Sequence, residues 1–109
     1  MSRIGVMGED RSDVATLKVL LRRIAPKIGV DGRAPAAGGC AALRKRLATF
    51  MRELAQGGCT TLLILHDLDL SPQNCELNDE AALRARLSEA AVPAGVERLI
   101  CIPVEELEA

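Results

Sequence analysis

The sequence has almost no aromatic residues. Among its 109 residues there is one Phe, and Trp and Tyr are absent. Proteins that hold single-stranded nucleic acid on a stacking platform need aromatic faces against which the bases can lie. The composition therefore argues against this class of binding protein.

An excess of charge of either sign is also lacking, since 14 Lys and Arg residues stand against 15 Asp and Glu residues, for a net charge of −1. Without a general basic field, contact with nucleic acid must use a local patch. One group of basic residues lies in the middle of the chain, at Arg44, Lys45, Arg46 and Arg52. Such a group usually forms a solvated helix face, and contact with phosphates is the alternative that stays open.

The four cysteines form no CxxC pair, and with a single histidine they argue against a structural zinc site. Cys59 and Cys101 lie beside or within apolar runs, and we expect both to be small core residues. The N-terminus is charged at Arg3, and no apolar segment approaches the length of a signal peptide or a membrane span. We therefore expect a cytoplasmic protein without a membrane partner.

What is present is an alternation of strand-like and helix-like segments. Strand patterns cover residues 3–7, 60–66 and 97–104, and a weaker, irregular strand is expected within residues 28–37. Apolar residues at helical spacing run from Ser12 to about Pro26, from Cys40 to Leu54 and over residues 79–91. We expect Ser12 to be the N-cap of the first helix.

This β-α-β-α-β-α-β order predicts one α/β domain over residues 1–109, because the chain is near the common size of a single domain. The sheet should be mostly parallel, with about four strands and helices on both faces. The unbroken apolar run TLLIL, which leads into His66, suits a strand that is covered on both faces.

Acidic residues follow the first and third of these strands. Glu9 and Asp10 come after the first, and Asp67 and Asp69 come after the third. Ligands of open parallel sheets bind outside the carboxyl ends of the strands, so these acids converge if the two strands are neighbours. Grouped carboxylates repel one another unless a cation lies among them, and Mg²⁺ prefers oxygen ligands. The sequence predicts an Mg²⁺ (or Mn²⁺) site at Glu9, Asp67 and Asp69.

Purely structural explanations stay open for several residues. As an acid in the first turn of a helix, Asp13 is well explained by the helix dipole. His66 is expected to pack at the strand end rather than to bind a metal. Gly38 and Gly39 either let a phosphate approach a helix N-terminus or form an ordinary turn between strand and helix.

The ordered acids resemble the Toprim family, which includes topoisomerases, primases, recombination proteins and the overcoming-lysogenisation-defect nucleases. The stretch GEDRSDVATLKVLL is similar to the opening of the nuclease branch, and LHDLD is similar to its DxD motif. The likeness covers essentially the whole chain and implies a three-layer, Rossmann-like Toprim fold. Asp10 departs from it by standing at a usual Gly position. Relatives usually continue beyond the position of Ala109, so a C-terminal extension could be lacking.

This resemblance implies metal-dependent cleavage or transfer at nucleic-acid phosphodiesters. Glu9 would act as general base or acid and lie near the metal, while Asp67 and Asp69 would bind Mg²⁺. A second ion near Asp13 would suit a two-metal mechanism.

The expected partners follow from the same resemblance. Gly38, Gly39, Arg44 and Lys45 would contact nucleic acid, DNA in preference to RNA. A partner ATPase or another protein, and a second copy of the chain in a homo-oligomer, are further expected partners.

Two other classes of function stay open. A receiver domain that accepts a phosphoryl group also has acids after its first and third strands, but the last predicted strand lacks Lys: the only lysines are Lys18, Lys27 and Lys45. The other class is an interaction module that keeps the fold without catalysis.

Overall fold

The computed structural model describes residues 3–36, 40–66 and 80–102 of the chain. Strands and helices alternate along these residues, as the sequence predicts. The elements are β1 (Arg3–Met7), α1 (Arg11–Ile24), β2 (Gly29–Arg33), α2 (Cys40–Gln56), β3 (Thr61–Leu65), α3 (Glu80–Ser88) and β4 (Glu97–Cys101). None of the helices among these elements combines the length and apolar composition needed to cross a membrane.

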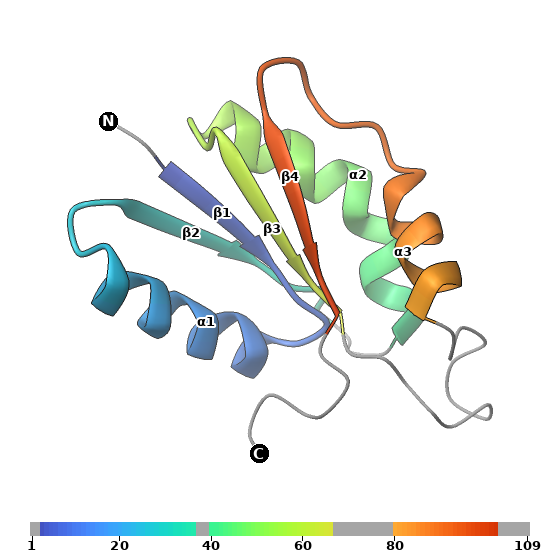
Figure 1. The fold of residues 1–109 in the computed structure, drawn as a ribbon, viewed down its shortest axis with the longest axis horizontal. Coiled ribbons are helices and arrows are strands. Elements are labelled where there is room, and N and C mark those ends of the chain that lie inside the picture. Colours follow the sequence, from blue (N-terminus) through green and yellow to red (C-terminus); the bar gives the residue numbers. More distant parts are fainter. Residues whose placement is uncertain (1–2, 37–39, 67–79, 103–109) are drawn as a thin grey trace.

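The described strands form one parallel sheet in the order β2-β1-β3-β4, so the expected α/β fold class is confirmed. Helix α1 covers one face of this sheet, over β1 and β2, whereas α2 and α3 cover the other (Figure 1). The three layers and the parallel strands make the fold Rossmann-like. The chain moves outward from β1 to β2 and then crosses back to β3, so the strand order reverses between β1 and β3.

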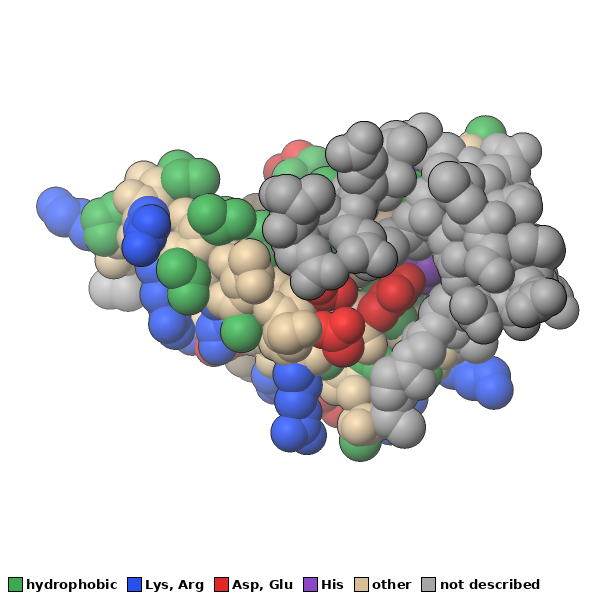
Figure 2. Space-filling model, turned by 90° about the horizontal axis from the view of Figure 1, so that it is seen from below, with side chains coloured by type: hydrophobic (Ala, Val, Ile, Leu, Met, Phe, Trp, Pro, Cys, Tyr) green, Lys and Arg blue, Asp and Glu red, His purple; other side chains and the backbone are tan. Residues whose placement is uncertain are grey.

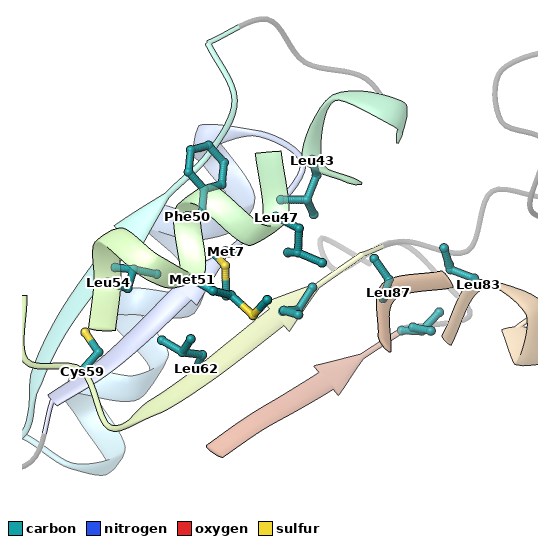
Figure 3. Packing of buried hydrophobic residues seen from close by; sticks show 12 residues of the cluster. Met7, Leu43, Leu47, Phe50, Met51, Leu54, Cys59, Leu62, Leu83 and Leu87 are labelled. Carbon is teal, nitrogen blue, oxygen red and sulfur yellow. The ribbon is translucent and has the colours of Figure 1, made fainter. Parts of the chain in front are cut away.

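The larger part of the core lies between the sheet and helices α2 and α3 (Figure 3). Leucines recur along α2 at helical spacing and form a stripe that faces the sheet. This cluster consists of Met7, Leu43, Leu47, Phe50, Met51, Leu54, Cys59, Leu62, Ile64, Leu83, Leu87 and Ile102. A smaller cluster under α1 contains Val6, Val14 and Val30.

The face of β3 and β4 that points toward the α1 side is only partly covered. Leu63 is half-buried, and Leu99, its partner in the register, is 48% exposed. The prediction that β3 is covered on both faces is confirmed in part: on this face Leu65 is buried, whereas Thr61 and Leu63 are half-buried, because α1 packs over β1 and β2 (Figure 1). Cys59 is buried as expected, but Cys101 is exposed, since it lies on the same uncovered face of the outer strand.

Helix α1 packs closely on β2 because residue 32 is a glycine. A Cβ atom at Gly32 would overlap Cγ1 of Val14 and lie 3.2 Å from Cδ of Lys18. Val14 has little freedom to move away, because a β-branched side chain in a helix has one strongly preferred χ1 rotamer. The distance between α1 and the sheet edge thus depends on the missing side chain at this position.

Gly32→Ala should therefore lower the free energy of unfolding by about 1–3 kcal/mol, the usual cost of overpacking. Gly57→Ala is the matched control, because a Cβ atom there would meet its nearest atom at 3.5 Å, an ordinary contact. Urea unfolding of both variants gives the comparison. Equal stability of the two variants would contradict the close approach of α1 to β2.

Candidate functional site

The candidate site lies at the carboxyl ends of β1 and β3, the two central strands. These strands are parallel neighbours, and Met7 at the end of β1 pairs in register with Ile64 near the end of β3. Glu9 follows β1 and His66 follows β3, so the topology brings them to the same edge. Edges of this kind, where the strand order reverses, are where open α/β sheets bind ligands.

Glu9 and His66 are in contact across this edge. Nδ1 of His66 lies 2.8 Å from Oε1 of Glu9, with side-chain exposures of 0% and 18%. The backbone amide of His66 donates a hydrogen bond to the carbonyl of Cys101 at 3.1 Å, which ties the end of β3 to β4. The imidazole therefore has a fixed place beside the carboxylate.

Arg44 of α2 approaches the other ring nitrogen of His66. Nη1 of Arg44 lies 3.5 Å from Nε2 of the imidazole. Because a guanidinium group only donates hydrogen bonds, a hydrogen bond at this contact requires an unprotonated Nε2. The ring proton would then be on Nδ1, which faces Glu9.

The carboxylate of Glu9 lies between the imidazole and the surface. Its Oε1 is buried and faces Nδ1 of His66 at 2.8 Å, and 18% of the side chain stays exposed. Hard cations such as Mg²⁺ prefer carboxylate oxygens, so a carboxylate at this edge fits the expected ion. In Figure 2, acidic side chains gather beside the histidine on this side of the molecule.

Asp10 has a structural role that the sequence analysis assigned to Ser12. The N-cap of α1 is Asp10, whose carboxylate accepts hydrogen bonds from the amide of Asp13 at 2.9 Å and from Oγ of Ser12 at 2.7 Å. The expected cap at Ser12 is wrong because the helix begins two residues earlier than that cap implies, at Arg11. Asp13 lies in the first turn, where the helix dipole favours a negative charge.

Several predicted site residues lie outside the described part of the chain. These are Asp67, Asp69, Gly38 and Gly39. Among the described residues no three His, Cys, Asp or Glu side chains are grouped so as to hold a metal ion. The site made of three carboxylates therefore stays a prediction. The structure describes two parts of it, the position of Glu9 and the pairing of β1 with β3.

The two basic residues predicted to contact nucleic acid differ in their surroundings. Arg44 is half-buried and approaches His66, whereas Lys45 is exposed. Both line a hollow of about 300 Å³ between α2 and α3, together with Arg86 and Glu89. Contact with nucleic acid stays a prediction for both.

His66 has a closer connection to the site than the sequence suggested. It is fully buried, as expected of a packing residue, yet it also contacts Glu9. One signal in the sequence points this way: a polar ring stands between an apolar strand and the DxD acids. Its contact partner could not be read from the sequence, because Glu9 is 57 residues away (66 minus 9).

No known family model matches the sequence, and comparison with curated proteins gives no match either. The comparisons therefore add no function to the fold.

The tautomer of His66 can be measured directly, because it is the only histidine in the chain. We expect ¹⁵N NMR of the imidazole to show a protonated Nδ1 and an unprotonated Nε2 at neutral pH, since Arg44 can only donate. Arg44→Met should weaken this preference, whereas Lys45→Met, at a neighbouring exposed cation, should leave it unchanged. A proton on Nε2 in the wild type would contradict the arrangement.

The cap at Asp10 predicts a stability difference between two variants. Asp10→Ala should cost about 0.5–2 kcal/mol of unfolding free energy, and Asp10→Asn much less, because Asn also accepts the hydrogen bond. Urea midpoints at neutral pH provide the measurement. If both variants lost the same stability, the charge of Asp10 would matter and the cap would not.

The contribution of Asp10 should also depend on pH. The hydrogen bond from Ser12, followed by that from the amide of Asp13, holds the pKa of Asp10 below its ordinary value of 3.8. Because the folded state lowers this pKa, the contribution is fully present above the ordinary value and is lost as the pH falls through the folded one. The advantage of the wild type over Asp10→Ala should shrink in that range.

Proposed function

We propose that this chain is a Toprim-like domain of the nuclease-related branch, which binds Mg²⁺ or Mn²⁺ and acts on phosphodiester bonds of nucleic acid. The observation that carries this proposal is the position of Glu9, a carboxylate with 18% of its side chain exposed, at the edge where the strand order reverses and in contact with His66, the residue before Asp67.

In this proposal Glu9 holds the ion together with Asp67 and Asp69, and Asp67 is the next residue in the chain after His66. The bound ion would supply charge stabilisation for the phosphoryl group. His66 contacts the Glu9 carboxylate, and Arg44 contacts the other side of the His66 ring. The resemblance adds the role of general base or acid for Glu9.

Metal binding and cleavage test the proposal together. We expect the wild type to bind Mn²⁺ in calorimetry and to cut DNA in the presence of Mg²⁺ or Mn²⁺. Glu9→Gln and Asp67→Asn should each reduce Mn²⁺ affinity by at least about tenfold. Even the loss of a residue that only hydrogen-bonds to a metal ligand usually has an effect of this size. Both variants should also lose cleavage.

Glu97→Gln is the matched control, because Glu97 is an exposed carboxylate at the amino end of β4, the opposite edge of the sheet. It should keep the metal affinity and the cleavage of the wild type. A wild-type protein that neither binds Mn²⁺ nor cuts DNA or RNA would overturn the proposal. Metal binding without cleavage would instead favour a non-catalytic module, and labelling by acetyl phosphate that depends on Asp67 would favour a receiver domain.

A further inference from the structure

A basic groove lies between α1 and the end of β2, and neither Glu9 nor His66 is among the residues that line it. Its volume is about 450 Å³. Four of the residues that line it are cations, Arg11, Lys18, Arg22 and Arg33, and none is an acid. The sequence analysis did not identify this group, because Arg33 comes from a different element and the three others are spread over one helix.

The charges in this groove are largely unneutralised. Within residues 3–36, 40–66 and 80–102, the side chains of Arg11, Lys18 and Arg22 take part in no hydrogen bond or ion pair. Arg33 is the exception, since its Nε lies 3.3 Å from Oε1 of Glu53.

Helix α1 as a whole is strongly basic. It has four cations, the fourth being Arg23, and one acid, Asp13, for a net charge of +3 (4 minus 1). The whole chain has a net charge of −1. The groove is thus a local positive patch on a protein that is otherwise slightly acidic.

The cations form a row along the helix. Arg11, Lys18 and Arg22 are separated by seven and four residues, which corresponds to about 10 Å and 6 Å of helix rise. One strand of nucleic acid has a phosphate about every 3.4 Å along the helix axis, so this row extends over several consecutive phosphates. A row of this length suits a repeating polyanion better than a single phosphate group.

The remaining lining explains how a backbone could fit. Small side chains, Ala15 and Ala34, keep the groove open, and Val19 is 49% exposed beside it. The lining contains no aromatic side chain on which a base could stack. Contact would therefore be made with sugar and phosphate, which fixes position without reading the sequence.

We infer that this groove binds the sugar–phosphate backbone of a nucleic acid and leads the strand toward Glu9. Arg11 stands two residues after Glu9 and begins α1, so the groove opens next to the candidate site. Basic side chains lie on the α1 side of the acidic group in Figure 2. The choice of nucleic acid as the polyanion rests on the proposed function.

The test measures binding of a fluorescent single-stranded DNA oligonucleotide by anisotropy, with EDTA present so that no metal takes part. The variant Arg11→Gln, Lys18→Gln, Arg22→Gln removes three contacts. Each contact with single-stranded DNA contributes about 0.7 to the slope of log K against log salt, so the slope should fall by about 2. At 0.1 M salt this corresponds to roughly 100-fold weaker binding.

Lys27→Gln is the control for loss of charge, because Lys27 is an exposed cation in the turn between α1 and β2, outside the groove. It should change affinity by about twofold or less. The variant Arg11→Lys, Arg22→Lys keeps the charges and should keep the salt slope of the wild type. Circular dichroism of the triple variant verifies that it is folded.

Unchanged salt dependence in the triple variant would overturn the inference. Competition by inorganic phosphate would also overturn it if, per phosphate, it were as effective as competition by unlabelled oligonucleotide. The groove would then bind single anions. If Glu9→Gln abolishes cleavage while the triple variant binds normally, the groove inference fails and the proposed function stands. If the wild type cleaves no nucleic acid but the triple variant loses DNA binding, the proposed function fails and the groove inference stands.

Discussion

The parallel pairing of β1 with β3 is the constraint on which the candidate site depends. This pairing places the residues that follow the two strands next to each other, although Glu9 and His66 are far apart in the chain. The imidazole of His66 lies between the carboxylate of Glu9 and the guanidinium of Arg44 and contacts both. Oε1 of Glu9 is buried against the imidazole, and 18% of the side chain stays open to an ion.

The two residues in contact at this site differ in how far they are buried. His66 is fully enclosed by the core under α2, whereas Glu9 keeps 18% of its side chain exposed. The carboxylate can therefore meet an ion or a substrate from outside while the imidazole behind it stays dry. In metal sites generally, residues that contact the ligands in this way fix the orientation of those ligands.

Acidic and basic side chains lie on different parts of the molecule, although its net charge is close to zero. Acidic side chains gather at the carboxyl edge of the sheet, and cations extend along α1 from Arg11. An acidic site alone would repel a polyanionic substrate. A neighbouring basic row would offset that repulsion and hold the substrate close to the acids.

The sequence by itself determined the order and type of the elements, because apolar spacing at helical or strand period is a local property. It also placed Glu9 at the end of a strand. Only the tertiary structure decided the contact of His66 with Glu9 and Arg44, since that depends on which strands are neighbours and where α2 packs.

The same reason accounts for the sequence-based expectations that failed. Ser12 and Asp10 are both residue types that cap helices well. Asp10 is the N-cap because α1 begins at Arg11, the next residue. Cys101 has apolar neighbours like a core residue, but it is exposed because α1 packs over β1 and β2 and leaves that half of the face uncovered. The groove exists because Gly32 lets α1 lie close to β2. Local patterns define elements, whereas sites form where distant elements meet.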